Sequence, residues 1–352
     1  MTVILFILGL MMATLGALAA PCPAGEVREP LKAALELHDA GKLKEAIAEY
    51  DKVIKVYPKL AEAYFNRGNA YYDLGQARQA LRDYNQVLRL HPKDAEAYYN
   101  RGNSHRRLKQ PQAALKDYSA AIKLNPEDIR SYINRGSLHF DARNYEAAVK
   151  DFSEAIRIDP KDAQSHYNRG NAYLALNKRD EAIRDFDAAL NRDSKLADAY
   201  YNRGIAYADA EKYEEAIRDF DEVLRLDPQS AEAFYNRGLA KMRLGKFAES
   251  IDDYSEAMRL NPKDPEAPFN RGLAYLRTDK YEYAARDFTE VISMQPKNAD
   301  AYVYRGLIRV YQDQQKDADA DFAKAFQLDP GLKRKIQPII DEARMKVKEA
   351  RK

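Results

Sequence analysis

Seven asparagines recur along the chain at a constant interval of 34 residues, and each is followed by Arg and Gly. A carboxamide side chain carries both a hydrogen-bond donor and an acceptor, so a row of carboxamides suits the backbone of an extended polypeptide. Because one hydrogen bond contributes a net ~1 kcal/mol, such a row would hold a partner only collectively. A second interpretation is that each asparagine bonds to the neighbouring repeat and sets the twist of the array. The seven are Asn66, Asn100, Asn134, Asn168, Asn202, Asn236 and Asn270.

The arginine after each asparagine predicts an ion pair. When a repeat is counted from position 1 at Ala61, Arg occupies position 7, at the border of an apolar face, and Asp occupies position 23. A partly buried cation needs a partner of opposite charge, so we expect one structural Arg–Asp pair in each of the last eight repeats. The first repeat has Ala33 and Glu49 at these positions. Such pairs specify geometry more surely than they add stability. The arginines are Arg67, Arg101, Arg135, Arg169, Arg203, Arg237, Arg271 and Arg305, and the aspartates are Asp83, Asp117, Asp151, Asp185, Asp219, Asp253, Asp287 and Asp321.

Two histidines are the only candidates for metal-assisted chemistry. His105 and His139 both occupy position 11, in consecutive repeats, but no compelling third ligand accompanies them. The chain contains neither a phosphate-binding G-x-x-x-x-G-K-[ST] loop nor a G-x-S-x-G nucleophile elbow. We therefore expect histidines satisfied within the core, and no catalytic residue, metal site or cofactor.

The elements that would position these side chains are two helices per repeat. Positions 4, 8 and 11 share one helical face, and Gly at position 8 would allow close approach of the second helix at its small residue, position 20. Position 24 is aromatic in all nine repeats, and position 32 is Pro in eight of them, where it should end the second helix. A fixed period of this length is typical of a stacked array.

This pattern resembles the tetratricopeptide repeat family, which has an aromatic residue at position 4, Gly at 8, Tyr at 11, Ala at 20, an aromatic residue at 24 and Pro at 32. Arg at position 7 departs from the family, where that position is usually apolar. The resemblance implies an all-α fold, an α-α superhelix (a right-handed solenoid) of antiparallel helix pairs. Nine repeats are expected, at residues 27–60, 61–94, 95–128, 129–162, 163–196, 197–230, 231–264, 265–298 and 299–332. Residues 333–352 are expected to form a basic helix that caps the last repeat.

In the resembled family, positions 2, 6, 9 and 13 line the concave surface, so the position-6 asparagines are expected there. Position 9 changes from Asn or Ser in the first half of the chain to Ile or Leu in the second. An apolar strip beside aromatic and Arg side chains could anchor a protein partner, although position 9 could also pack against the adjacent helix. These further candidate partner-binding residues are Tyr201, Tyr235 and Phe269 at position 5, Ile205, Leu239, Leu273 and Leu307 at position 9, and Arg243 and Arg277 at position 13.

Charge and cysteine content narrow the possible functions. The net charge is +2, from 57 basic and 55 acidic residues, which gives no reason to expect nucleic acid as the partner. The single Cys excludes an internal disulfide framework and a zinc site built from cysteines.

The first twenty residues contain no charged side chain and end in small residues, which is typical of a secretory signal peptide. We expect residues 1–20 to be cleaved and residues 21–26 to form a linker, which makes the protein periplasmic or secreted. An uncleaved membrane anchor is the first alternative, because an apolar run of this length nearly spans a bilayer. Lipid modification at Cys22 is the second, and Pro21 disfavours it.

These observations favour an exported, non-enzymatic scaffold that binds an extended or helical segment of a partner protein in its concave groove. Membrane contact is expected only through the N-terminal segment, if that segment is not cleaved. Self-association of the arrays and a co-chaperone-like role in envelope assembly are alternatives within the binding class. A metal-assisted activity around His105 and His139 represents the enzyme class.

Overall fold

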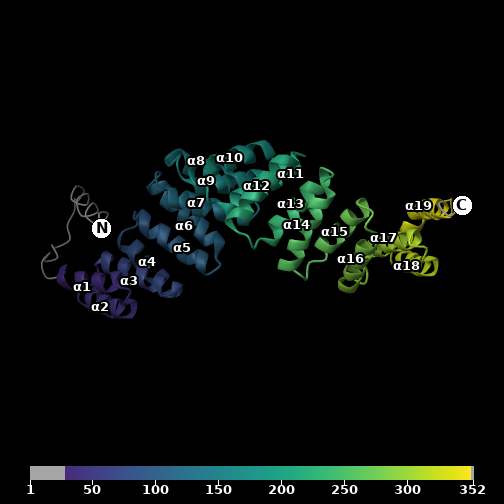
Figure 1. Ribbon diagram of the computed structural model, residues 1–352. Helices are drawn as coiled ribbons and strands as arrows, with labels where there is room; N and C mark the ends of the chain where they lie inside the picture. Colours follow the sequence, from purple (N-terminus) through teal and green to yellow (C-terminus); the bar gives the residue numbers. More distant parts are fainter. Residues whose placement is uncertain (1–27, 350–352) are drawn as a thin grey trace. The chain divides into compact units, whose positions relative to one another are not determined.

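The computed structural model describes residues 28–349, and the predicted all-α fold class is confirmed there: the described residues form helices joined by short turns and contain no strand (Figure 1). The expected signal peptide and linker lie outside the described residues. None of the helices between residues 28 and 349 has the length and apolar character needed to cross a membrane.

Nineteen helices make up the described part of the chain. Each odd-numbered helix up to α17 is the first helix of a repeat, and the even-numbered helix after it is the second. The helices are α1 (Arg28–Asp39), α2 (Leu43–Val56), α3 (Ala61–Asp73), α4 (Ala77–Leu90), α5 (Ala95–Arg107), α6 (Pro111–Leu124), α7 (Ile129–Asp141), α8 (Tyr145–Ile158), α9 (Ala163–Ala175), α10 (Arg179–Arg192), α11 (Ala197–Asp209), α12 (Tyr213–Leu226), α13 (Ala231–Arg243), α14 (Phe247–Leu260), α15 (Glu266–Arg277), α16 (Tyr281–Met294), α17 (Ala299–Tyr311), α18 (Gln315–Leu328) and α19 (Pro330–Glu349).

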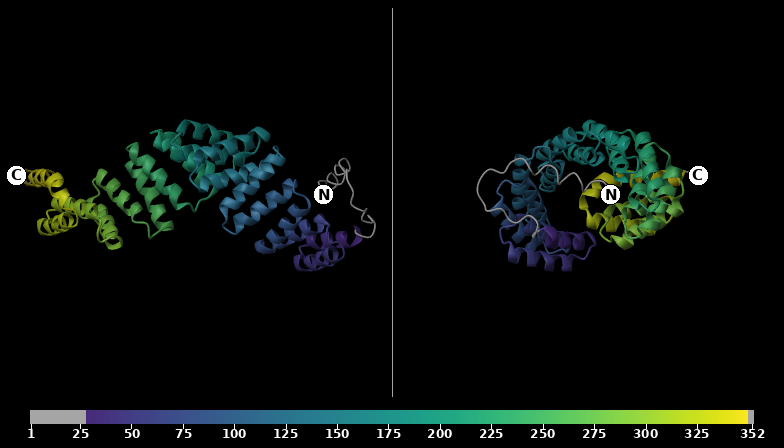
Figure 2. Two further views of the ribbon diagram at one scale, coloured as in Figure 1. Left: turned by 180° about the vertical axis from the view of Figure 1, so that it is seen from behind. Right: turned by 90° about the vertical axis from the view of Figure 1, so that its left-hand side faces the viewer.

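The chain divides into two compact units, Met1–Leu138 (unit 1) and His139–Lys352 (unit 2). Unit 1 contains α1 to α6 and most of α7, and unit 2 contains α8 to α19. Within each unit the two helices of a repeat pack against each other and the second helix packs against the first helix of the next repeat, as Figures 1 and 2 show. Each unit is therefore a stack of antiparallel helix pairs in chain order.

The turn inside each repeat enters the left-handed region of backbone space at position 15. Glycine occupies that position in three repeats, with φ between 74° and 85°. Six repeats place another residue there, at φ between 56° and 63°, although a Cβ in this region costs roughly 1–2 kcal/mol. Asn177, Asp279 and Asp313 are residue types that tolerate this region, whereas at Lys109, Arg143 and Glu211 the geometry of the tight turn overrides the local preference.

The second helices end at the same position of the repeat whether or not a proline follows. The second helix α4 ends at Leu90, two residues before Pro92, as the proline at position 32 predicts. Helix α10 ends at the equivalent residue, Arg192, although position 32 there is Ser194. Proline is therefore not required to end the second helix, because the packing of the following repeat ends it at the same place.

In seven repeats the core contains a buried aromatic ring on the second helix that lies against the position-8 glycine of the first. A Cβ added to Gly102 would lie 2.7 Å from Cε1 of Tyr118, and one added to Gly170 would lie 2.7 Å from Cε1 of Phe186. The sequence predicts the small residue at position 20 as the neighbour of this glycine. The ring at position 24 supplies the nearest atoms and is what needs the space left by glycine.

Helix α19 packs on α17 and α18 at the end of unit 2. Its residues Ile340 and Ala343 are buried in one cluster with Val310 and Phe322. The helix begins at Pro330, which is an ordinary place for proline because the first turn of a helix needs no backbone donor there.

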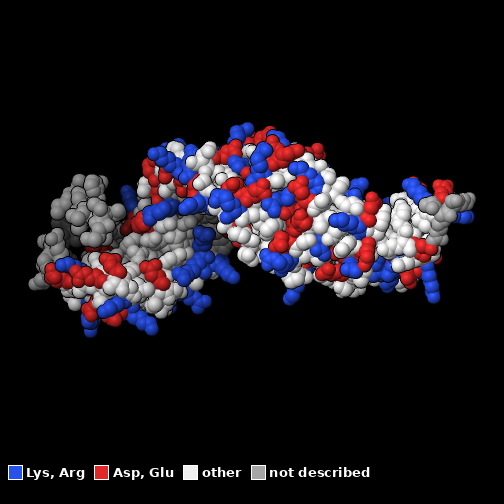
Figure 3. Space-filling view, in the orientation of Figure 1, with Lys and Arg blue, Asp and Glu red and all other residues white. Residues whose placement is uncertain are grey.

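Figure 3 shows blue and red side chains interspersed over the visible surface of both units. This mixture agrees with the near-neutral net charge of +2.

Candidate functional site

The predicted Arg–Asp pairs are present and buried. In α5 and α6, Arg101 donates from Nε and Nη2 to the two carboxylate oxygens of Asp117, at 2.8 and 2.6 Å. Seven repeats share this two-bond arrangement, so the prediction is confirmed for them. The pairs are Arg67–Asp83, Arg101–Asp117, Arg169–Asp185, Arg203–Asp219, Arg237–Asp253, Arg271–Asp287 and Arg305–Asp321.

Each of these guanidinium groups also reaches the second helix of the preceding repeat. Nη1 of Arg203 donates to Asp187 at 2.5 Å, and Nη1 of Arg271 donates to the hydroxyl of Ser255 at 2.9 Å. One arginine thus ties three helices together. Sequence reasoning missed this contact, and the signal for it is position 25, which carries a polar residue in eight repeats: Asp51, Asn85, Ser119, Ser153, Asp187, Asp221, Ser255 and Thr289.

The pKa shifts of these pairs indicate a structural role. Burial raises the pKa of the Asp287 carboxyl, and the two hydrogen bonds from Arg271 offset part of that rise. The hydrogen bonds to Asp117 raise the pKa of the Arg101 guanidinium, which therefore stays charged. Because the aspartate side chains are almost fully buried and both of their oxygens are in use, they are unsuited to acid–base chemistry.

Both candidate metal-binding histidines lie beside the aspartate of their own repeat. Nε2 of His105 is 3.7 Å from Oδ2 of Asp117, and its Nδ1 is 2.7 Å from Oε1 of Gln110. Nε2 of His139 is 3.9 Å from Oδ2 of Asp151. Residues 28–349 contain no group of three or more His, Cys, Asp or Glu side chains arranged to hold a metal ion. Each histidine belongs to the polar core of one repeat.

The amide nitrogens of five position-6 asparagines bond to the preceding repeat. Nδ2 of Asn202 donates to Oδ1 of Asn171 at 2.8 Å and to the hydroxyl of Tyr167 at 3.3 Å. Asn100 and Asn134 donate in the same way to Asn69 and Asn103. These bonds support the interpretation in which the asparagines fix the packing of successive repeats.

In the later repeats position 9 is apolar, and the asparagines find other acceptors. Nδ2 of Asn236 donates to the hydroxyl of Tyr201 at 2.9 Å and to the backbone oxygen of Glu232 at 3.0 Å. Asn270 makes the equivalent bonds to Tyr235 and to its own helix, both at 3.0 Å. Both hydrogens of each amide are thus used, while no residue in the described chain donates to Oδ1 of these asparagines.

The two remaining asparagines of the row, Asn66 and Asn168, are also half-buried. Oδ1 of Asn168 accepts a hydrogen bond from Gln164 at 2.9 Å.

The apolar and aromatic candidates of unit 2 are half-buried rather than free. Ile205 packs beside Phe220, and Leu307 packs beside Val310 and the residues of α19. Tyr201 packs on two adjacent clusters, and Phe269 meets the ring of Phe288 at 5.5 Å. The four position-9 side chains, Ile205, Leu239, Leu273 and Leu307, all keep part of their surface open to solvent, as do Tyr235 and Phe269. Arg243 and Arg277 are exposed.

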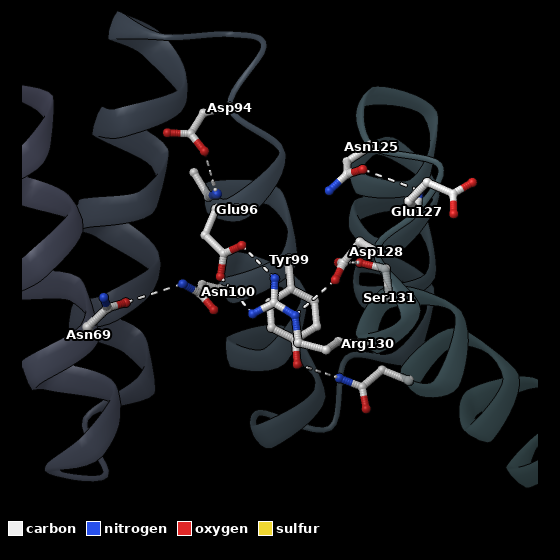
Figure 4. A network of polar contacts seen from close by, with 12 residues as sticks. Asn69, Asp94, Glu96, Tyr99, Asn100, Asn125, Glu127, Asp128, Arg130 and Ser131 are labelled. Carbon is white, nitrogen blue, oxygen red and sulfur yellow. Dashed lines mark hydrogen bonds and ion pairs between the residues drawn. The ribbon is translucent and has the colours of Figure 1, made fainter. Parts of the chain in front are cut away.

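Unit 1 contains a network that the sequence does not predict, shown in Figure 4. Arg130 occupies position 2 of α7, where most repeats have an acidic residue. Its Nη2 and Nη1 lie 2.6 and 3.0 Å from the carboxylate of Glu96, and its guanidinium lies 4.4 Å from the ring centroid of Tyr99. Nε of Arg130 donates to Asp128 at 2.9 Å.

Unit 1 also holds a polar pocket of about 320 Å³, with walls that include Asn69, Tyr72, Asn100 and Asn103. His38 and Asp73 close one side of it, at 3.0 Å from each other.

An array of 34-residue helix pairs, with rows of side chains repeated along its first helices, defines a helical-repeat protein. Profiles of the tetratricopeptide repeat family match residues 34–75, 65–129, 140–177, 167–231, 201–265, 235–299 and 269–332. The chain therefore belongs to the tetratricopeptide repeat family. Members of this family are generally non-enzymatic scaffolds for interactions between proteins.

Two solved structures with TM-scores above 0.5 share the fold. A tetratricopeptide repeat protein from Parabacteroides merdae is 23% identical, with a TM-score of 0.51, over 70% of this chain and 98% of that chain. The C-terminal part of a protein from Cytophaga hutchinsonii is 18% identical, with a TM-score of 0.52, over 77% of this chain and 97% of its own. YrrB, described as having an unusual peptide-binding site, is 29% identical over 51% of this chain and 92% of its own, with a TM-score of 0.48. No curated protein matches the chain.

Proposed function

We propose that this protein is an exported, non-enzymatic scaffold that binds an extended or helical segment of a partner protein along the first helices of unit 2. The observation that carries the proposal is the combination of side chains on α11, α13 and α15. Half-buried Leu239 and Leu273 keep apolar surface open, next to Asn202, Asn236 and Asn270, whose amide oxygens have no donor in the described chain.

This combination suits a polypeptide better than a small metabolite. Apolar side chains of the partner would cover the leucines, and its backbone N–H groups would donate to the amide oxygens. The asparagines contribute acceptors only, because their own hydrogens already bond to the preceding repeat or to their own helix. Partner binding and repeat packing therefore use different atoms of the same side chains.

Site-specific photo-crosslinking in cells tests the proposal. A photoreactive amino acid at Arg243, next to the proposed site on α13, is expected to give a discrete adduct with the partner. The matched control places the same group at Ala248 on α14, which is also exposed and begins the second helix of the same repeat. Mass spectrometry of the adduct identifies the partner.

Three results are distinguishable in this experiment. An adduct at Arg243 that is absent at Ala248 supports binding along the first helices. An adduct with twice the mass of the chain identifies self-association. Equal adducts at both positions, or an adduct at Ala248 alone, would rule out this surface as the binding site.

Export rests on residues 1–20 and is tested separately. Fusion of residues 1–26 to a reporter that is active only outside the cytoplasm is expected to give activity, with a mature fusion that lacks the first twenty residues. Full-length fusion that sediments with membranes would establish the anchor instead, and an inactive fusion would contradict export.

A further inference from the structure

In unit 1 an arginine of one repeat binds to an acidic and an aromatic side chain on the first helix of the preceding repeat. The guanidinium of Arg130 lies between the carboxylate of Glu96 and the ring of Tyr99, which are positions 2 and 5 of the preceding repeat. Positions 2 and 5 are three residues apart on a helix, so their side chains share a face. The side chain of Arg130 is 48% exposed, so this place is open to solvent. We call a position-2 carboxylate beside a position-5 tyrosine a cation slot.

The same local structure recurs twice in unit 2. Glu232 and Tyr235 on α13 repeat the residue types of Glu96 and Tyr99, and Asp198 and Tyr201 on α11 form a shorter version.

The tyrosines of all three slots are held in the same way. The hydroxyl of Tyr99 accepts from Asn134 at 3.3 Å, and the hydroxyl of Tyr235 accepts from Asn270 at 3.0 Å. Tyr201 accepts from Asn236 at 2.9 Å. The asparagine of the next repeat thus forms the same hydrogen bond to each of the three hydroxyl groups. We therefore use the arrangement at Glu96 and Tyr99 to infer that of the other two slots.

The slots of unit 2 differ from that of unit 1 in charge. The residue equivalent to Arg130 is Glu232 for the slot at Asp198–Tyr201 and Glu266 for the slot at Glu232–Tyr235. In unit 2 two carboxylates therefore occupy the positions where unit 1 has a carboxylate and a guanidinium. None of Asp198, Glu232 and Glu266 forms an ion pair within residues 28–349.

The negative charges near these two tyrosines raise the pKa of their hydroxyl groups. Burial raises the pKa of Tyr201, and the negative charge of Glu232 raises it further. Burial and the charge of Glu266 act on the pKa of Tyr235 in the same direction. A cation at either slot would meet two carboxylates and the face of a ring, the groups that attract guanidinium and ammonium ions.

We propose that the slots at Asp198–Tyr201 and Glu232–Tyr235 bind two cationic side chains, arginine or lysine, of the partner segment. This proposal rests on the proposed function, because the slots lie on the same helices as Leu239 and the position-6 asparagines. It adds the chemistry of the partner: a segment with positive charges spaced by one repeat and apolar residues beside them.

The spacing of the slots defines a probe. Packed helices lie about 8–10 Å apart, and three residues of extended chain span about 10 Å. The probe is therefore a short synthetic peptide with two arginines three residues apart and leucines between them. Its control is the same peptide with citrulline for arginine, which keeps the size and planar shape of the side-chain end but loses the charge, since a carbonyl oxygen replaces one NH2 group.

The experiment measures both peptides by fluorescence anisotropy against the full-length protein and two charge variants. The test variant is Asp198→Asn with Glu232→Gln. The matched control is Glu214→Gln with Asp252→Asn, which removes two exposed carboxylates from the second helices α12 and α14 of the same unit. A third variant, Leu239→Ala, reports on the apolar part of the surface.

We expect the arginine peptide to bind roughly tenfold more tightly than the citrulline peptide, as two exposed ion pairs with cation–π contacts would give. The test variant should lose that difference, whereas the control should retain it. Equal affinity for both peptides, with a loss in Leu239→Ala, would overturn the slots and leave the proposed function standing. Failure of the arginine peptide to bind at millimolar concentration would overturn the slots as well, while the crosslinking result decides the proposed function independently.

Discussion

Replacement of Asp287 by Ala is expected to destabilise unit 2 by about 3 kcal/mol, because it leaves the guanidinium of Arg271 buried without a counter-ion. The side chain of Asp287 is 4% exposed and accepts two hydrogen bonds from Arg271, at 2.9 and 2.7 Å. After the replacement, Arg271 retains the hydroxyl of Ser255, which carries no charge. The measurement is urea denaturation of the purified protein, followed by its helical circular dichroism.

A second aspartate provides the matched comparison. Asp219 pairs with Arg203 in the same two-bond geometry, but Arg203 also donates to Asp187 at 2.5 Å. Asp219→Ala should therefore cost clearly less than Asp287→Ala, since one counter-ion remains. Equal losses would show that the contact to the preceding repeat contributes nothing to holding the arginine.

Gly170→Ala is expected to destabilise the protein by about 1–3 kcal/mol, the usual range for an overpacked core. This sign is opposite to the ordinary effect in a helix, where Ala is better than Gly by about 1 kcal/mol. The added Cβ would lie 2.7 Å from Cε1 of Phe186, a ring with no exposed surface. Thermal and urea denaturation of the variant measure the loss.

Gly238→Ala is the control for this effect. There the nearest atom, Cε1 of Tyr254, lies 3.1 Å from the added Cβ, so the ring needs to move less. The loss should be smaller than for Gly170→Ala. A gain in stability in both variants would mean that the ring at position 24 is not what requires glycine at position 8.

The helix pairs and their ion pairs could be predicted because each depends on contacts within one repeat. Arg203 and Asp219 stand at positions 7 and 23, and helical spacing is enough to bring those positions to facing helices. The close approach of the second helix to Gly170 could be predicted, but the residue that contacts the glycine could not. Which residue on the second helix meets a glycine depends on the rotation of that helix about its own axis, which sequence periodicity specifies only coarsely.

The candidate site was harder to predict because its hydrogen bonds join different repeats. The carboxamide of Asn236 has both donors and acceptors by its chemistry. Only the position of Tyr201 on the preceding first helix shows that the donors are used inside the array. Arg130 stands at a position that is acidic in most repeats. Its role could not be predicted, because it depends on the distance to Glu96, which is 34 residues away in sequence.

The amino-acid sequence by itself therefore determined the repeat family, the all-α fold and the buried Arg–Asp pairs of seven repeats, since a constant period of 34 residues places the same residue types at the same positions of successive repeats. The tertiary structure alone decided which atoms of the asparagines remain free, how each arginine joins three helices, and where a carboxylate and a tyrosine form a slot for a cation. The physical reason is that these features depend on the distances between side chains of successive repeats. Those distances follow from how the helices stack, and the spacing of residues along one helix does not specify them.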